Sequence, residues 1–189
     1  MQLNYFNRPH FENGAIEKIS KVLKSHGIKN PIICSDPGLS SIGMTKKIGS
    51  LISDNLSPSF YEETPANPTE KAVSEALEIY KSNSCDGVIG FGGGSSMDLG
   101  KAVALMANHD GKLIDHSVVQ GGYKKITETV PMIAIPTTSG TGSEVSDGAL
   151  IIMNDGRKLI LASPNLRPNA AICDPELTIG LPPNLTAGA

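Results

Sequence analysis

The sequence predicts an α/β fold, in which a mostly parallel sheet is covered by helices on both faces and a β-hairpin is added. Over the first two thirds of the chain, short apolar runs typical of buried strands alternate with segments whose apolar residues recur at helical spacing. The last third differs, because Asn154-Asp155-Gly156 separates two apolar stretches and an Asp-Gly pair favours a tight hairpin turn. A glycine cluster at 92–94 marks the point where a strand leads into a helix.

The predicted elements follow one another in a regular order. The first helix is expected over 14–24, where apolar residues from Ile16 to Leu23 share one face and Gly27 suits the C-terminal cap. Another helix opens at Asn67, which suits an N-cap because proline follows it at the first helical position. The other expected strands are 31–34, 59–61, 86–90, 131–135 and 170–173, the hairpin spans 145–161, and the other helices are 42–55 and one with its body at 102–106.

Composition excludes several classes of partner. The chain has 189 residues and a formal net charge of −3, so we expect no nucleic-acid partner. Its apolar runs are too short to cross a bilayer and its first residues do not resemble a signal peptide, so we expect no membrane partner. Three cysteines, Cys34, Cys85 and Cys173, form no Cys-x-x-Cys pair and are expected to be reduced, which favours a cytoplasmic location.

The most informative segment joins a predicted strand to a predicted helix. A Gly-Gly-Gly-Ser-Ser sequence occupies 92–96. Glycines let a backbone approach a phosphate, and the N–H groups at the start of a helix attract an anion. The segment therefore predicts a site for the pyrophosphate of a nucleotide cofactor. It is neither Gly-x-Gly-x-x-Gly nor a P-loop, because Ser95 takes the third glycine position and Ala102 follows Lys101. The alternative is a turn whose glycines only allow close packing.

A second polar loop follows the strand expected at 131–135. Residues 136–145 include five hydroxyl side chains and two glycines. The loop lies at the carboxyl end of a strand, where open α/β sheets bind their ligands, so it could bond to a ribose, an amide or a phosphate. The alternative is a Ser/Thr/Gly loop with no ligand.

Asp36 follows the strand expected at 31–34. A carboxylate there can accept two hydrogen bonds from a ribose diol and would repel a 2′-phosphate, so Asp36 favours NAD over NADP. The alternative is that Asp36 only starts an Asp-Pro turn at 35–38.

Five short motifs occur in order along the chain. They are Asn67-Pro68-Thr69; Gly92-Gly93-Gly94-Ser95-x-x-Asp98-x-x-Lys101; Pro136-Thr137-Thr138-x-Gly140-Thr141-x-x-Glu144; Ser163-Pro164; and Asp174-Pro175-x-Leu177-Thr178-x-x-Leu181-Pro182-Pro183. This series closely resembles the N-terminal half of the iron-containing (group III) alcohol dehydrogenases. The resemblance covers essentially all 189 residues, and five motifs in register make it specific.

The resemblance implies a Rossmann-like domain that binds NAD, or less favourably NADP. It places this domain at 1–180 and makes 181–189 the start of a linker or of the first helix of a C-terminal all-helical domain. That second domain would hold a catalytic Fe2+ or Zn2+ in the full-length enzyme, and we expect it to lie outside this chain. Asn184 suits the N-cap of its first helix.

The resemblance also implies roles for individual residues, all of them in cofactor binding. No catalytic or metal-ligating residue is assigned within this chain. The residues expected to wrap the pyrophosphate are Gly93, Gly94, Ser95 and Ser96. Asp98 would stand near the nicotinamide or fix the loop. The other expected cofactor contacts are Thr137, Thr138, Leu177 and Leu181 on the adenine side, Thr141 and Ser146 nearby, Lys158 at the ribose or nicotinamide, and Asn67 close to the dinucleotide.

The implied activity is an NAD(P)-dependent, metal-dependent alcohol dehydrogenase or aldehyde reductase acting on a small alcohol or aldehyde. We expect the chain alone to bind the dinucleotide weakly and to catalyse nothing. One alternative is a related enzyme such as a glycerol dehydrogenase, a maleylacetate reductase or a dehydroquinate synthase. Another is a stand-alone nucleotide-binding module without catalysis.

Two further expectations concern the surface. The resemblance implies a homo-oligomer, in which residues 1–6 could form a strand that pairs with its copy in a partner subunit. All four histidines, His10, His26, His109 and His116, are expected to be ordinary surface residues, because none has the spacing of a metal-binding pair.

Overall fold

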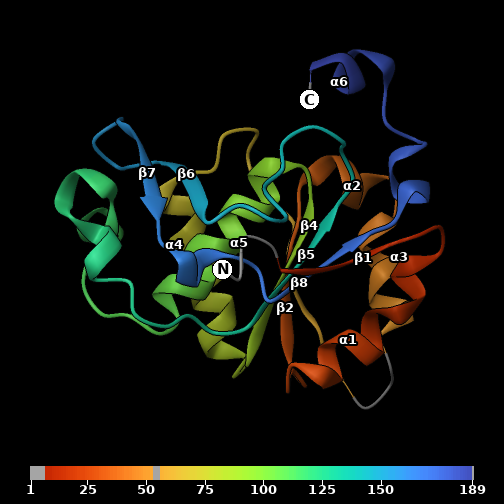
Figure 1. Ribbon diagram of the computed structural model, residues 1–189, viewed down its shortest axis with the longest axis horizontal. Helices are drawn as coiled ribbons and strands as arrows, with labels where there is room; N and C mark the ends of the chain where they lie inside the picture. The colour runs from red at the N-terminus through yellow and green to blue at the C-terminus, as the bar shows by residue number, and fades with distance from the viewer. Residues whose placement is uncertain (1–6, 53–55, 189) are drawn as a thin grey trace, which may run out of the picture.

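The sheet predicted from the sequence is present and its strands run parallel. The computed structural model describes residues 7–52 and 56–188. A six-stranded sheet has the order β1-β8-β5-β4-β2-β3, and each neighbouring pair is parallel (Figure 1). Its strands are β1 (Arg8–Phe11), β2 (Pro31–Cys34), β3 (Ser59–Tyr61), β4 (Gly87–Gly92), β5 (Met132–Pro136) and β8 (Ala170–Cys173).

Helices cover both faces of this sheet, as predicted. The α-helices are α1 (Ile19–Ser25), α2 (Pro37–Ser41), α3 (Met44–Leu51), α4 (Glu70–Ser82), α5 (Gly94–Met106) and α6 (Pro183–Gly188). Short 3-10 helices occupy η1 (Ala15–Lys18), η2 (Leu113–His116), η3 (Val118–Gln120), η4 (Gly122–Lys124), η5 (Pro164–Leu166) and η6 (Pro175–Thr178). No helix in the described ranges is long and apolar enough to cross a membrane.

Two apolar cores lie on opposite faces of the sheet. Ile32 packs in the core with α4 and α5, whereas the next residue, Ile33, packs in the core with α1 and α3. Successive side chains of a strand point to opposite faces, so a buried parallel strand fills both cores. Figure 1 shows α4 and α5 on one side of the sheet and α1 and α3 on the other.

The β-hairpin forms a separate two-stranded sheet. Strands β6 (Gly148–Ile152) and β7 (Lys158–Ala162) are antiparallel, and the turn between them contains Gly156 at φ +85°. Ile151 and Leu161 are fully buried against α4 and α5, whereas the paired residues Leu150 and Ile160 on the other face are exposed. The first strand begins at Gly148, later than predicted, because the preceding residues form the polar loop.

Two local predictions about strands and caps are wrong. Strand β1 was not expected, because Arg-Pro-His-Phe is not an apolar run; it is an edge strand held by backbone pairing with β8. Helix α4 begins at Glu70, and Thr69 is its N-cap in place of Asn67, since Thr69 Oγ1 accepts the N–H of Ala72 at 3.1 Å. The strand proposed at 1–6 lies outside the described residues.

Three further details differ from the predictions. The turn expected after β2 is the start of helix α2, which Asp36 caps. Asn184 lies inside α6, which begins at Pro183. His116 is buried, with its ring edge-on to His109 at a centroid distance of 5.3 Å, and burial lowers its pKa. The sequence did not reveal this burial because it depends on how the segment after α5 folds back.

The three cysteines are free, and Cys34 and Cys85 are buried. Burial raises the pKa of Cys34 far above its ordinary value of 9.0, and the nearby Cys85 adds to the shift. The thiol of Cys34 therefore keeps its proton in the folded state at an alkaline pH at which the unfolded chain loses it. The contribution of this thiol to the free energy of unfolding is complete below pH 9 and falls as the pH rises above 9.

We predict that replacing Cys34 with alanine flattens this dependence. Between pH 9 and 11, the free energy of unfolding of the native chain should fall relative to that of Cys34→Ala by about 1.4 kcal/mol per pH unit. Below pH 9 the two should differ by a constant amount. Urea denaturation at a series of pH values measures the difference, and a gap that stays constant up to pH 11 would contradict the assignment.

Candidate functional site

A cavity of about 700 Å³ opens where the carboxyl ends of β2, β4 and β5 meet. Open α/β sheets bind their ligands at this edge. Residues after each of these strands line the cavity, and the segment 176–185 contributes a further wall. Nine of the residues predicted to bind a cofactor line it: Asp36, Gly93, Gly94, Ser95, Ser96, Thr137, Thr138, Leu177 and Leu181.

The turn between β4 and α5 is built so that only glycine fits at its first position. Gly92 has φ +143°, and a Cβ there would lie 2.6 Å from Ser96 Oγ. Gly93 is the N-cap of α5 and has an extended backbone. The N–H groups in the first turn of a helix have no partner within the helix and carry its positive end. Gly94, Ser95 and Ser96 provide this first turn to the cavity.

Asp36 combines the two roles considered for it. Its Oδ1 accepts the N–H of Leu39 at 3.0 Å and so caps α2. Its Oδ2 lies 3.1 Å from the position that a Cβ on Gly92 would take, so the carboxylate also borders the glycine turn. Capping therefore does not remove Asp36 from the cavity wall.

A second cavity of about 390 Å³ shares Gly94 with the first. Gly94 lines both cavities, and a Cβ at this position would lie 3.2 Å from the side chain of Thr141. Besides Gly94, three predicted residues line the second cavity: Asp98, Thr141 and Ser146. Leu150 and Ile160 of the hairpin add an apolar wall that the sequence analysis did not anticipate. The two cavities thus meet at the start of α5.

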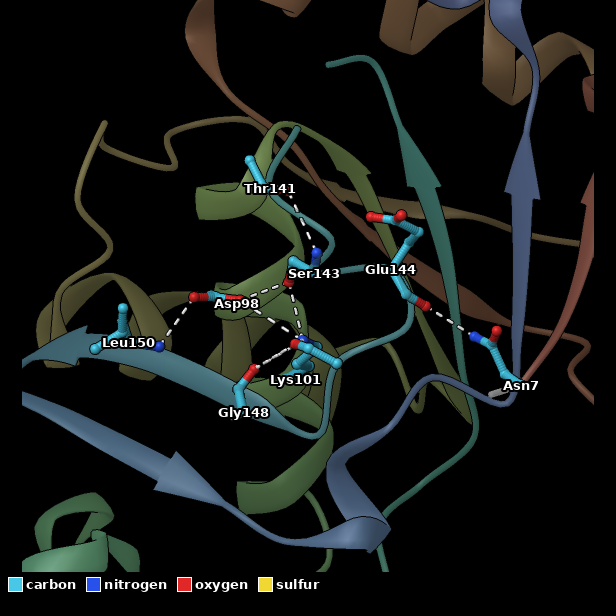
Figure 2. A network of polar contacts seen from close by, with 9 residues as sticks. Asn7, Asp98, Lys101, Thr141, Ser143, Glu144, Gly148 and Leu150 are labelled. Carbon is cyan, nitrogen blue, oxygen red and sulfur yellow. Dashed lines mark hydrogen bonds and ion pairs between the residues drawn. The ribbon is translucent and has the colours of Figure 1, made fainter. Parts of the chain in front are cut away.

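A buried lysine, Lys101, bonds to residues that line the second cavity, and Figure 2 shows its network of polar contacts. The side chain of Lys101 is fully buried, and its ammonium donates to Ser143 Oγ at 2.9 Å, Ser146 Oγ at 2.8 Å and the Gly148 carbonyl at 2.7 Å. Asp98 Oδ1 lies 3.7 Å from the same nitrogen. Burial lowers the pKa of Lys101 to about 8, although nearby carboxylates, Asp98 first, oppose the shift.

Asp98 uses both oxygens to hold the chain around this lysine. Oδ1 accepts the hydroxyl of Ser143 at 2.7 Å, and Oδ2 accepts the N–H of Leu150 at 2.9 Å. These bonds fit the loop-fixing role considered for Asp98. The sequence analysis gave Lys101 no role, and the spacing Asp-x-x-Lys, one helical turn, was the signal that could have indicated one.

Asn67 and Lys158 line neither cavity. They contact each other instead, since Lys158 Nζ donates to Asn67 Oδ1 at 2.8 Å and so ties the hairpin to the loop before α4. Ser95 Oγ donates to the Ala66 carbonyl at 2.5 Å, which joins the same loop to the start of α5. The structure therefore brings these two residues together outside both cavities, next to the loop that Ser95 joins to the start of α5.

The parallel sheet, the glycine turn and the cavity at the strand ends define a Rossmann-like α/β domain. A sequence model of iron-containing alcohol dehydrogenases matches residues 7–175, so the chain belongs to the iron-containing alcohol dehydrogenase family. Relatives include 4-hydroxybutyrate dehydrogenase of Cupriavidus necator, 43% identical over 97% of this chain and 48% of that protein. Alcohol dehydrogenase 4 of Schizosaccharomyces pombe is 35% identical over 94% of this chain and 42% of that protein.

Solved structures agree with this assignment. A 1,3-propanediol oxidoreductase superposes with a TM-score of 0.90 at 28% identity, over 99% of this chain and 49% of that one. Sulfoacetaldehyde reductase from Bifidobacterium kashiwanohense, solved in complex with NAD+, gives 0.88 at 30% identity, over 99% of this chain and 50% of that one. The chain thus spans about half the length of the relatives that it matches.

The family name implies a metal, and the residues of this structure do not provide for one. Within 7–52 and 56–188, no three His, Cys, Asp or Glu side chains gather closely enough to hold an ion. His109 and His116 contact each other, and His109 Nε2 accepts the N–H of Thr127 at 3.2 Å, so its ring is committed to the fold.

We predict that Asp98→Ala destabilises the chain by about 2 kcal/mol, because the buried ammonium of Lys101 loses its anion and the N–H of Leu150 loses its acceptor. Lys71→Ala is the matched control, since it removes an exposed ion pair with Glu75 and should change stability little. Urea denaturation of both variants measures the effect. Equal losses would show that the network around Asp98 contributes no more than a surface pair.

Proposed function

We propose that this chain is the dinucleotide-binding part of an NAD-dependent alcohol dehydrogenase or aldehyde reductase. Hydride would pass between the nicotinamide and a small alcohol or aldehyde. The observation that carries the proposal is that two cavities meet at Gly94, at the start of α5. A dinucleotide has two nucleoside halves joined by a pyrophosphate, and a helix N-terminus attracts that pyrophosphate.

The sizes and linings of the cavities suggest which nucleoside half of the dinucleotide each cavity binds. The larger cavity is lined by apolar side chains, which suit an adenosine: Ile42, Met44, Leu177 and Leu181. The smaller cavity has the hydroxyls of 141–146 on one side, which suit the nicotinamide ribose. In this arrangement Gly93, Gly94, Ser95 and Ser96 bind the pyrophosphate, and Thr137 and Thr138 border the adenine side.

Asp36 favours NAD over NADP. Its carboxylate borders the larger cavity beside the glycine turn, where it would accept hydrogen bonds from a ribose diol. A 2′-phosphate at that position would meet a negative charge at short range. We therefore assign NAD as the cofactor.

The cofactor supplies the hydride chemistry, and the residues of this chain bind and orient it. A metal would have to be held by residues outside those described, so no step is assigned to one here. We propose 1–180 as the cofactor domain, with a boundary at 181. The named activities of the relatives, which include 4-hydroxybutyrate and general alcohol dehydrogenases, support a small alcohol or aldehyde as substrate. A homo-oligomer in the cytoplasm fits the same family.

Calorimetric titration with NAD and then NADP tests the proposal, because the chain has no tryptophan to report binding by fluorescence. We expect NAD to bind and NADP to bind at least about tenfold more weakly, a difference of about 1.4 kcal/mol. Binding of neither dinucleotide would overturn the assignment of the two cavities.

Asp36→Ser is a matched variant for the choice between the two cofactors. Serine is also a good N-cap, so α2 should remain intact while the negative charge is removed. The ratio of NADP to NAD affinity should rise about tenfold or more. An unchanged ratio would show that Asp36 is only the cap of α2.

A further inference from the structure

We propose that Lys101 is a positioning residue for the nicotinamide half of the cofactor. The ammonium of Lys101 holds the wall of the smaller cavity in place without touching the dinucleotide. The inference rests on the proposed function, since it deepens the role of the same site. Lys101 lines neither cavity, and its side chain is fully buried. Lys101 therefore makes no direct contact with a ligand in either cavity, and we infer that it acts through the residues that it holds.

The groups that accept from Lys101 are part of the cavity wall. Ser143, Ser146 and Gly148 each accept a hydrogen bond from the ammonium, and each lines the smaller cavity. Figure 2 shows these bonds fanning from α5 to the loop that follows β5 and to the first residue of β6. One buried nitrogen thus fixes three points of the wall.

The opposite side of this loop has a separate anchor. Asn7 Nδ2 donates to the Glu144 carbonyl at 2.8 Å and to the Pro168 carbonyl at 3.1 Å. In Figure 2 the loop passes between Asn7 and Lys101. Loss of the lysine contacts would therefore free the side of the loop that faces the cavity while the other side stays attached.

The hydrogen bonds specify the charged form of Lys101. The hydroxyl of Ser143 donates to Asp98 at 2.7 Å, and that of Ser146 donates to the Gly148 carbonyl at 3.3 Å. With both hydroxyls donating in this way, both serine oxygens accept from Lys101. An ammonium has three N–H donors for its three acceptors, whereas a neutral amine has two, so its third contact would require a serine hydroxyl to turn away from its present acceptor and donate to the nitrogen.

Three carboxylates favour the proton and burial opposes it. Asp98 on α5 is the nearest, and Glu144 and Asp147 on the loop act at longer range. Burial outweighs them and lowers the pKa of Lys101 to about 8. The third N–H donor of Lys101 is therefore lost as the pH rises through about 8. The hold of Lys101 on the cavity wall should then depend on pH, which a contact between groups that do not titrate would not.

The test compares NAD with ADP-ribose, which lacks the nicotinamide, by calorimetry on the full chain from pH 6.5 to 9.5. At pH 7 NAD should bind more tightly than ADP-ribose, and this advantage should fall several-fold as the pH passes about 8. The affinity for ADP-ribose should change little. A ratio of the two affinities that is one, or that does not change with pH, would overturn the inference and leave the proposed function intact. Failure of both ligands to bind would overturn the proposed function itself.

Lys101→Met gives a second measurement. The variant should bind NAD about tenfold more weakly at pH 7, keep its ADP-ribose affinity within about twofold and lose the pH dependence. Lys81→Met, on the exposed end of α4, is the matched control and should behave like the native chain. Equal weakening of both ligands would mean that Lys101 only supports the fold. If Lys101→Met does not fold, the pH dependence of the ratio of NAD to ADP-ribose affinity in the native chain still tests the inference.

Discussion

Close contact between α5 and β4 is the constraint on which the rest of the structure depends. A Cβ on Gly100 would lie 3.4 Å from the Cα of Gly90 and 3.0 Å from Met132 Cε, so helix and strand approach this closely because neither glycine has a side chain. This packing places the start of α5 directly at the end of β4, through the glycine turn. It also brings the third turn of the helix, with Lys101, behind the loop that follows β5. The helix start that attracts an anion and the two cavities beside it thus both depend on the close packing of α5 on β4.

The charged network on α5 extends this constraint to the hairpin. Asp98 accepts the N–H of Leu150, and Lys101 donates to the carbonyl of Gly148, so both residues hold the first strand of the hairpin. Lys158 on the second strand is paired with Asn67. The hairpin is therefore fixed to α5 at one edge and to the loop before α4 at the other. Its apolar pair, Leu150 and Ile160, is left facing the smaller cavity or solvent.

The sequence alone predicted what is local, and missed what depends on distant contacts. Apolar runs located the four internal strands of the sheet, because strands buried on both faces must be apolar, and a short apolar run also located the edge strand β3. Strand β1 was missed because its pairing with β8 involves backbone groups and not its side chains. The role of Lys101 was missed because its acceptors lie 42 to 47 residues away. The N-cap of α4 was assigned to Asn67 and not to Thr69 because both residue types suit an N-cap, and residue type alone does not distinguish them.

A crystal structure of this chain with NAD+ tests the central claim most directly. The account predicts the pyrophosphate oxygens against the backbone N–H groups at 94–96, the adenosine in the larger cavity beside Asp36, and the nicotinamide in the smaller cavity beside Ser146. A dinucleotide bound with its pyrophosphate away from the start of α5, or with both halves on one side of Gly94, would contradict it.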